Sequence, residues 1–384
     1  MTVPGAQNHE PAVAPIATPT YAVITGGGTS GHVLPALAIA DALVARGHQR
    51  QSIHYVGTTR GVETRLLPPT GYPHTLLDVV GLQRSFSMRN LWVLPKLLRA
   101  TWTAYGLLGR LRPRVVVNVG GYGSFPATLA ARLRRVPIVV VSYDRRPGLV
   151  SKLFARGAAA CAVAFEGSAL PHAELTGSPV RREIVGIDRV AGRREALVAL
   201  GLPPDRFVIA VVCGSLGAAA VNDVVVDAVE RLSARRDLAV YHVVGQRFLE
   251  GAAPARDGDD GILYRVIGYE ERMPLVYTAA DLMLTRGGAG TVAELATAGV
   301  PAIIVPWPAA AENHQVDNAR VLSDHGAALL IEQSQLTADR LVDEIERLRS
   351  SPDDLAAIAA AAHQAGALHR SDALVTLIER EAGR

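Results

Sequence analysis

Residues 21–32, YAVITGGGTSGH, decide the fold of this 384-residue chain. Five residues that favour a buried strand run into a glycine turn, which ends at His32. Apolar residues then recur at helical spacing over about 33–46, and Gly47 stands where a helix C-terminal cap belongs. A strand, a glycine turn and a helix in this order begin a βαβ unit, so the stretch predicts an α/β domain.

The rest of the chain repeats this pattern. Its other predicted elements are strands at residues 52–56, 115–119, 137–141, 208–213, 239–244, 281–285 and 302–305, and a helix at 218–232. The strands are short and apolar throughout, which is typical of parallel strands that helices cover on both faces. The chain is therefore predicted to form two Rossmann-like domains whose parallel sheets face one another across a cleft.

The domain boundaries follow from composition. Residues 1–19, rich in Pro and Ala, are predicted to be a disordered tail and lack the features of a signal peptide. The first domain is predicted at residues 20–180 and the second at 181–369, with the polar, charge-rich stretch 181–205 as the link. A helix at about 370–384 is expected to be able to pack back on the first domain. The cleft, outside the carboxyl ends of the strands, is the predicted ligand site.

Metal chemistry receives little support from the sequence. Cys161 and Cys213 lie inside apolar runs, so they predict neither a disulfide framework nor a zinc site. No H-E-x-x-H motif and no histidine pair at i, i+4 occurs. Asp257-Gly258-Asp259 has the spacing of a D-x-D metal motif but is interpreted as a turn, because no apolar strand precedes it. We expect no protein-bound metal.

Charge is distributed unevenly. No acidic residue occurs between Asp78 and Asp144, whereas ten arginines and lysines do. This cationic region suits an anionic membrane surface or a pyrophosphate lipid. Within it, residues 81–114 interleave basic and apolar side chains, which indicates either an interfacial contact or a core-packed helix with a solvated face. No run of about 18 apolar residues occurs, so a spanning helix is not predicted.

The first glycine turn has the spacing G-x-G-x-x-G. A dinucleotide site would also need an acidic residue near the end of the second strand, but the next acid is Glu63, several residues beyond it. The turn is therefore interpreted as backbone that can approach an anion at a helix N-terminus. His32 either projects into the same space or caps the helix.

Two later glycine turns have the same setting between strand and helix. At residues 214–218, backbone N–H groups and the Ser215 hydroxyl could hold a phosphate, or the glycines could serve a tight turn alone. In the turn that begins at Arg286, Thr291 and Glu294 have the spacing of a capping box, and Glu294 could instead accept hydrogen bonds from sugar or ribose hydroxyls. The polar residues 312–318 either read sugar hydroxyls or form a solvated loop.

Together these motifs resemble the MurG family, the peptidoglycan N-acetylglucosaminyltransferases that convert lipid I to lipid II. The resemblance runs from about Tyr21 into the C-terminal helix. Its most specific parts are residues 26–32, 120–126, 177–181, 214–218 and 286–294, with Gln315 and Asn318.

The resemblance implies the GT-B fold, UDP-GlcNAc as donor, lipid I as acceptor, an inverting reaction and no cofactor. It also implies a peripheral place on the cytoplasmic face of the cell membrane, at the anionic inner leaflet. Proteins of cell-wall synthesis or division are implied as possible partners, and nucleic acid is not.

Site residues carry over motif by motif. At the donor the resemblance places Thr29, Ser30, Gly31, Arg181, Ser215, Gly217, Glu270, Gly288, Ala289, Gly290, Thr291, Glu294, His314 and Gln315. On the acceptor or membrane side it places Gly28, Gly121, Tyr122, Arg89, Trp92, Lys96 and Arg99. His32, Asp144 and Tyr122 are the implied catalytic residues, with His32 as the base because an imidazole pKa suits neutral pH.

One motif departs from the family. Where the family usually has His-Glu-Gln-Asn, this chain has Val141-Ser142-Tyr143-Asp144. Asp144 stands in place of the asparagine, and it can accept hydrogen bonds or act as a second base but cannot donate as an amide does. Three alternatives to the lipid I reaction stay open here: transfer to another acceptor, epimerisation of UDP-GlcNAc, and binding of the nucleotide sugar without turnover.

Overall fold

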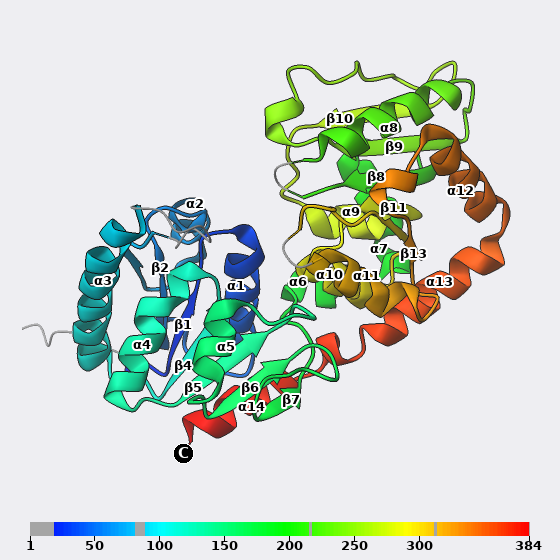
Figure 1. Cartoon of the computed structure of the whole chain (residues 1–384). Coiled ribbons are helices and arrows are strands. Elements are labelled where there is room, and N and C mark those ends of the chain that lie inside the picture. The colour runs from blue at the N-terminus through cyan, green and yellow to red at the C-terminus, as the bar shows by residue number, and fades with distance from the viewer. Residues whose placement is uncertain (1–18, 81–88, 215–216, 311–312, 384) are drawn as a thin grey trace, which may run out of the picture.

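Two parallel sheets, each covered by helices, make up the two domains of the structure, a computed structural model (Figure 1). It describes residues 19–80, 89–214, 217–310 and 313–383, and for residues 89–93 only the backbone. The first sheet has seven strands in the order β3-β2-β1-β4-β5-β6-β7, and the second has six in the order β10-β9-β8-β11-β12-β13. Every paired strand runs parallel to its neighbour.

The first domain contains the following elements. Its strands are β1 (Ala22–Gly26), β2 (Ile53–Thr58), β3 (His74–Leu77), β4 (Val115–Gly120), β5 (Ile138–Ser142), β6 (Ala160–Val163) and β7 (Ala173–Leu175). Its helices are α1 (Ser30–Ala45), α2 (Glu63–Leu66), α3 (Arg89–Leu111), α4 (Phe125–Arg134), α5 (Leu149–Ala155) and, from the far end of the chain, α14 (Ala373–Ala382). A short 3₁₀ turn, η3 (Tyr122–Ser124), leads into α4.

The second domain repeats the architecture. Its strands are β8 (Phe207–Val212), β9 (Leu238–Val243), β10 (Leu263–Ile267), β11 (Leu282–Thr285), β12 (Ala302–Ile304) and β13 (Leu329–Leu330). Its helices are α6 (Arg182–Val185), α7 (Arg189–Leu200), α8 (Ala219–Arg231), α9 (Met273–Ala279), α10 (Ala289–Ala298), α11 (His314–Ser323), α12 (Ala338–Ser350) and α13 (Pro352–Ala365).

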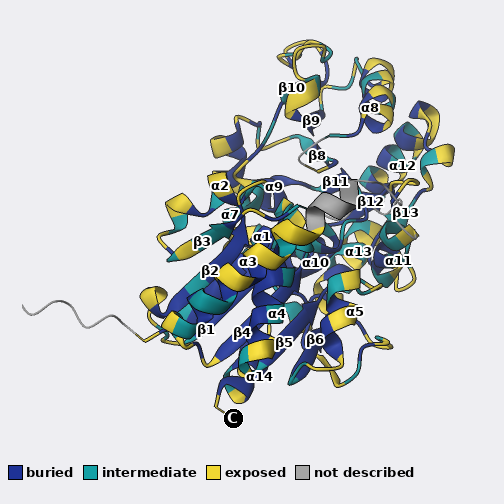
Figure 2. Ribbon diagram, turned by 60° about the vertical axis from the view of Figure 1, so that its left-hand side comes forward, coloured by how far each residue is buried: buried dark blue, intermediate teal, exposed yellow. Residues whose placement is uncertain are grey.

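The central strands are buried on both faces, as their apolar runs predict. All residues of β1, β4 and β5 are buried, and the alternating side chains of each strand enter two different cores. On β4, for example, Val117 packs into the core beside α1 and α14, whereas Val116 packs into the core beside α3 and α4. Figure 2 shows the buried strands inside and the exposed surface on the outer faces of the helices. Because these strands are packed on both faces, they hold in place the loops that follow their carboxyl ends.

The prediction that residues 181–205 form a link between the domains is wrong. The stretch forms α6 and α7, and α7 packs against α9 of the second domain. Leu197 and Leu200, with Ala196, are buried in that domain's core. These apolar residues lie on one helical face, and the many charges around them made the stretch look solvated.

The chain crosses between the domains twice, and the two crossings touch. At the first crossing Gly177 has φ +79°, and a Cβ there would lie 2.6 Å from the carbonyl oxygen of Leu368 in the second crossing. The backbone N–H of Ser178 donates to His369 Nδ1 at 3.0 Å. After the second crossing α14 lies beneath the first domain, against β4, β5 and β6 (Figure 1).

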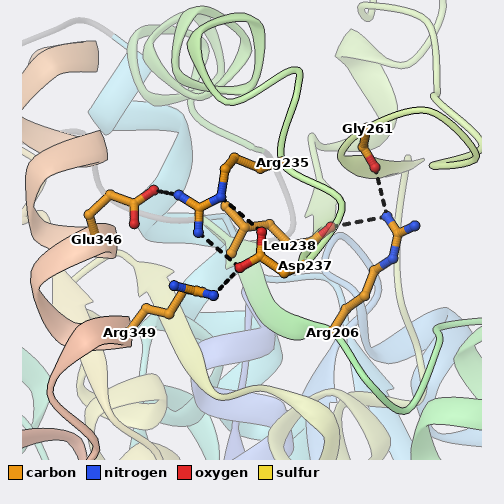
Figure 3. A network of polar contacts seen from close by, with 7 residues as sticks. All are labelled: Arg206, Arg235, Asp237, Leu238, Gly261, Glu346 and Arg349. Carbon is orange, nitrogen blue, oxygen red and sulfur yellow. Dashed lines mark hydrogen bonds and ion pairs between the residues drawn. The ribbon is translucent and has the colours of Figure 1, made fainter.

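A polar network lies between α12 and the start of β9 in the second domain (Figure 3). Arg235 donates two hydrogen bonds to Asp237, at 2.8 and 2.9 Å, and also contacts Glu346 of α12. These bonds hold the pKa of Asp237 down, at about 2. Arg349 of α12 contacts the same carboxylate, so the network fastens α12 to the start of β9.

Candidate functional site between the domains

A pocket of about 410 Å³ lies between the domains at the carboxyl ends of their strands. Its walls come from the first glycine turn, the loop after β5, and the N-termini of α10 and α11. The residues that line it are Thr29, Ser30, Gly31, His32, Leu34, Pro35, Tyr143, Asp144, Pro179, Arg181, Gly288, Ala289, Gly290, Thr291, Glu294, His314 and Gln315. The structure therefore brings together most of the residues that the sequence placed at the donor.

Part of the first glycine turn is already occupied by an internal carboxylate. The N–H of Gly28 donates to Glu63 Oε1 at 2.9 Å, and the N–H of Thr58 donates to the same oxygen at 3.1 Å. Glu63 is fully buried, and its Oε2 has no hydrogen-bond partner among the described residues. The expectation that this turn offers its N–H groups to an anion is thus wrong for Gly28, whereas residues 29–31 do line the pocket.

Glu63 is a residue that the sequence interpretation passed over. A Cβ on Gly27 or Gly61 would collide with its carboxylate, and a Cβ on Gly57 would lie 3.0 Å from its Cγ. The available signal was the pair Gly57 and Gly61 just before α2, because glycines close to a lone acid leave room for its side chain to be buried. The buried carboxylate of Glu63 therefore holds the first glycine turn in place through its hydrogen bond with the Gly28 N–H.

His32 faces the first domain's loops rather than open solvent. Its Nδ1 lies 3.1 Å from Thr29 Oγ1, and a Cβ on Gly120 would lie 3.3 Å from its ring. Burial lowers the pKa of His32, and the nearby charge of Asp144 opposes this by raising it. The imidazole is therefore held neutral near pH 7, which leaves it able to accept a proton.

Two tyrosines fix the same turn. The Tyr143 hydroxyl donates to the carbonyl oxygen of Gly31 at 2.5 Å. The Tyr122 ring covers Gly28, whose φ of +99° and close contact with that ring require glycine. Burial raises the pKa of both hydroxyls, so both stay protonated at neutral pH.

The third glycine turn, in contrast, is open. Gly288 is the N-cap of α10, and a Cβ on Gly290 would meet nothing within 4 Å. The first N–H groups of α10 have no intrahelical partner, and they point to the pocket side at the positive end of the helix dipole. This arrangement can receive an anion.

Glu294 is held toward the pocket by two side chains. Its Oε1 accepts from Arg181 Nη2 at 3.1 Å and Nε at 3.2 Å, and its Oε2 accepts from the Tyr277 hydroxyl at 2.7 Å. The capping-box alternative is wrong, because the N-cap of α10 is Gly288 and Thr291 lies inside the helix. Tyr277 is fully buried on α9 and was not foreseen, since no sequence spacing connects it with Glu294.

Polar side chains of α11 complete the pocket. His314 and Gln315 line it, and Gln315 Oε1 also accepts the backbone N–H of Trp307 at 2.9 Å. Residues 314–318 are therefore helical, so the alternative of a solvated loop is wrong for them. Asn318, one turn further on, is buried and donates to Asp144 at 3.2 Å across the two domains.

Some predicted residues lie elsewhere. Ser215 and the side chains of Arg89 and Trp92 fall outside the described residues. Gly217, at φ +66°, packs tightly against the Val244 carbonyl just before α8. Glu270 turns its carboxylate to Arg272 and the Tyr241 hydroxyl and is not among the residues that line the pocket.

A second, apolar cavity of about 410 Å³ adjoins the pocket inside the first domain. His32, Tyr143 and Asp144 line both spaces. The remaining lining is mostly apolar and comes from the segment after β3 and from α3, β4, η3, α4, β5 and α5 with the loops beside them: Val79, Val80, Leu97, Val119, Gly120, Gly121, Tyr122, Phe125, Val141, Ser142, Gly148, Leu149, Val150 and Ser151. Gly121 and Tyr122, predicted on the acceptor side, are therefore in its wall.

The two helices beside this cavity expose apolar side chains. On α3 they are Leu94, Leu98 and Trp102, the last 72% exposed, and on α5 they are Leu149 and Leu153. Lys96 and Arg99 are exposed on α3 as well. The opposite face of α3 packs against α4. The interpretation as a core-packed helix therefore holds for α3, whose other face carries exposed apolar and basic residues. The interfacial contact stays a prediction.

Neither a metal cluster nor a membrane span is found in the described part of the chain. No group of three or more His, Cys, Asp or Glu side chains there is placed to hold a metal ion. Asp257 and Asp259 are exposed in a bend before β10, as the turn interpretation predicts. No described helix is both long and apolar enough to span a membrane.

Sequence and structure comparisons agree with this geometry. The glycosyltransferase family 28 N-terminal domain matches residues 22–163, and the C-terminal domain of the same family matches 208–374. With two Rossmann-like domains and a polar pocket between them, the protein is a GT-B glycosyltransferase.

Individual relatives define the family further. A UDP-N-acetylglucosamine–N-acetylmuramyl-(pentapeptide) pyrophosphoryl-undecaprenol N-acetylglucosamine transferase of Desulforudis audaxviator is 36% identical over 94% of this chain and 98% of its own length. The Nocardioides sp. enzyme of the same name is 40% identical over 88% and 92%. The crystal structure of Acinetobacter baumannii MurG superposes with a TM-score of 0.71 at 29% identity, over 94% of this chain and all of that one. The chain belongs to the MurG family.

Proposed function

We propose that this protein transfers GlcNAc from UDP-GlcNAc to the 4-hydroxyl of the MurNAc unit of undecaprenyl-pyrophosphoryl-MurNAc-pentapeptide, lipid I. The products are lipid II and UDP, with inversion at the anomeric carbon. The observation that carries the proposal is the pocket between the domains. In this pocket His32 and Asp144 of the first domain face the open turn at residues 288–290 and Glu294 of the second domain. The names of the relatives supply the two substrates.

The second domain holds the donor. The open N-terminus of α10 receives the pyrophosphate, where the helix dipole and free N–H groups favour negative charge. Glu294, already oriented by Arg181 and Tyr277, accepts hydrogen bonds from the ribose hydroxyls. Gln315 and His314, which line the pocket from α11, bind hydroxyls of GlcNAc.

The first domain supplies the base. His32 takes the proton of the acceptor's 4-hydroxyl as that oxygen attacks the anomeric carbon from the side opposite UDP. The bond from the anomeric carbon to the phosphate oxygen breaks, and UDP leaves with the electron pair. Burial keeps His32 neutral beforehand, and Asp144 stabilises the imidazolium that forms. The charge that develops on UDP is stabilised by the N-terminus of α10.

The apolar surroundings of His32 favour a lipid acceptor over a soluble one. The apolar cavity opens beside the base, and exposed leucines of α3 and α5 flank it. Lys96 and Arg99 add positive charge on the same side, which an anionic leaflet attracts by about 1 kcal/mol per residue. We infer that this face of the first domain docks on the cytoplasmic leaflet as a peripheral contact.

Transfer is tested by incubating the purified protein with UDP-GlcNAc alone, with lipid I, and with a soluble MurNAc-pentapeptide. We expect UDP release that depends on lipid I, together with a disaccharide-lipid product. Equal release with the soluble acceptor would instead indicate a transferase of another acceptor class. Formation of an epimerised sugar without acceptor would indicate an epimerase, and binding of UDP-GlcNAc without any product would indicate a silent binding protein.

Docking is tested by sedimentation with liposomes that contain anionic lipid. Replacing Arg89, Lys96 and Arg99 by glutamine should reduce the bound fraction, with the largest difference at low salt because exposed charges are screened by salt. A matched variant replaces three exposed arginines of the other domain by glutamine: Arg236, Arg340 and Arg347. Equal binding by both variants would contradict docking through α3.

A further inference from the structure

The buried amide of Asn318 joins the two domains at the edge of the site. It lies on α11 and has no exposed surface. Its Nδ2 donates to Asp144 Oδ1 at 3.2 Å and to the Gly287 carbonyl at 3.3 Å, and its Oδ1 accepts the N–H of Arg145 at 3.0 Å. A carboxylate and a carbonyl can only accept here, and an N–H can only donate, so these partners fix which way the amide points.

Asp144 stands where the pocket and the apolar cavity meet. It lines both spaces, as His32 does. Its charge raises the pKa of His32 against the effect of burial. Two further neighbours of His32 are uncharged: Thr29 Oγ1 is 3.1 Å from Nδ1, and the Tyr143 ring centre is 6.4 Å from that of the imidazole. Whatever holds Asp144 therefore influences the base.

We propose that Asn318 is a positioning residue that reaches from the second domain and holds the Asp144 carboxylate beside His32. The inference rests on the proposed transfer reaction and adds a residue to it. The same amide holds Gly287, at the start of the open glycine turn, so one buried group connects the donor side with the acceptor side.

The departure of this chain from the family motif fits this role. An asparagine at position 144 could donate or accept, whereas Asp144 can only accept. Asn318 supplies the matching donor from the other domain. A hydrogen bond of 3.2 Å is lost when the domains separate by even a few tenths of an ångström. The pairing of Asp144 with His32 is therefore fixed only while the cleft has the width seen here.

The test replaces Asn318 by aspartate, which has the same shape but no N–H to donate and sets a second carboxylate against Asp144. We expect kcat/KM for lipid I to fall by roughly 10- to 100-fold, because a buried hydrogen bond to a charged group is replaced by repulsion. The Kd for UDP-GlcNAc should rise by a smaller factor, because on the donor side only the bond to the Gly287 carbonyl is lost. An unchanged kcat/KM would overturn the proposal.

A second variant separates positioning from folding. In Asp144→Asn with Asn318→Asp the donor and acceptor are exchanged across the same gap. We expect this pair to recover a severalfold part of the loss seen with Asn318→Asp alone, as coupled neighbours do. Strictly additive losses would show that Asn318 does not act through Asp144.

Asp317→Asn is the matched control on the same helix. Asp317 accepts from Arg146 Nε at 2.5 Å, so it also bridges the domains, but it lies on the rim, where Arg146 is half exposed. Exposed pairs contribute little, so kcat/KM should stay within about twofold of the unmodified protein. A loss as large as that of Asn318→Asp would mean that any contact between the domains matters, and the specific role would be refuted.

Nuclear magnetic resonance titration of His32 gives a readout that needs no turnover. Asn318→Ala removes the amide without adding a charge, so it should lower the pKa of His32, because Asp144 is no longer held beside it. Asp317→Asn should leave that pKa in place, and an unchanged His32 titration in Asn318→Ala overturns the positioning role. If the unmodified protein fails to use lipid I at all, the proposed function is wrong, and this titration still decides whether Asn318 positions Asp144.

Discussion

The first and third glycine turns look alike in sequence but differ in what fills them. Each follows a buried strand and leads into a helix, α1 or α10. In the first turn a buried carboxylate, Glu63, takes the Gly28 N–H, and the Tyr122 ring covers the glycine. In the third, Gly290 borders open space and Glu294 lies beside it at the pocket wall.

The difference shows that glycine serves two purposes in such turns. In the first turn the missing side chains make room for the protein's own groups, which lock the turn and with it His32. In the third they make room for a ligand. The glycine spacing alone does not distinguish these two cases. They differ in where the nearby carboxylate lies: Glu63 accepts a hydrogen bond from the first turn itself, whereas Glu294 lies beside the third turn at the pocket wall. Four predictions test the contrast.

The largest effect is expected at the first turn. His32→Ala should lower turnover by roughly 100- to 10,000-fold, the usual contribution of a general base, because it removes the imidazole that lines both the pocket and the apolar cavity. Binding of UDP should survive, as measured by calorimetry. A collapse of UDP binding would show that the first turn holds the donor after all.

A smaller effect is expected at the third turn. Glu294→Gln removes the charge that accepts from Arg181 and Tyr277, and we expect affinity for UDP-GlcNAc to fall roughly 10- to 100-fold. The KM for lipid I should change much less. Equal losses for the two substrates in steady-state kinetics would remove the distinction between the turns.

Alanine at one glycine of each turn should give opposite results. Gly28→Ala places a side chain at φ +99° against Tyr122, which should destabilise the fold by about 1–3 kcal/mol and lower the midpoint of thermal unfolding. Gly290→Ala, inside α10, should leave that midpoint unchanged or slightly raised. Its Cβ enters the pocket and should weaken donor binding. A lower unfolding midpoint in Gly290→Ala and an unchanged one in Gly28→Ala would contradict this difference between the two turns.

The smallest effect concerns pH. Because burial lowers the pKa of His32, activity should be lost only as pH falls below its usual value of about 6.5. Asp144→Asn removes the charge that raises this pKa and should move the acid limb of kcat/KM to still lower pH. Glu294→Gln should leave the limb in place, and a shift in that variant would link the third turn to the base.

Much of the fold could be predicted because its signals are local. The predicted strands lie within two residues of the observed ones, since short apolar runs mark them directly. The start of α1 was predicted three residues late, at 33 rather than at Ser30, because its first turn carries no apolar residue before Val33. The charged stretch that forms α7 was misread because its buried face is narrow.

The pocket residues that belong to a sequence motif were predicted. The residues that hydrogen-bond to them from distant parts of the chain were not. Glu63 reaches Gly28 over 35 residues of chain, and Asn318 reaches Asp144 over 174. Such pairs form only once the sheets bring distant loops to one edge. Asn318 was recognisable as part of a motif, but nothing in its neighbours along the chain indicates that its partner lies in the other domain.

The position of α14 has a consequence for synthesis on the ribosome. Leu374, Leu377 and Ile378 belong to the core of the first domain, which therefore lacks one of its covering helices until residues near 382 have left the exit tunnel. The second domain, whose last helix ends at Ala365, has all its elements earlier. The half of the protein that is translated first is thus the half that finishes folding last, and until then part of one apolar face of its sheet is uncovered and can be bound by chaperones.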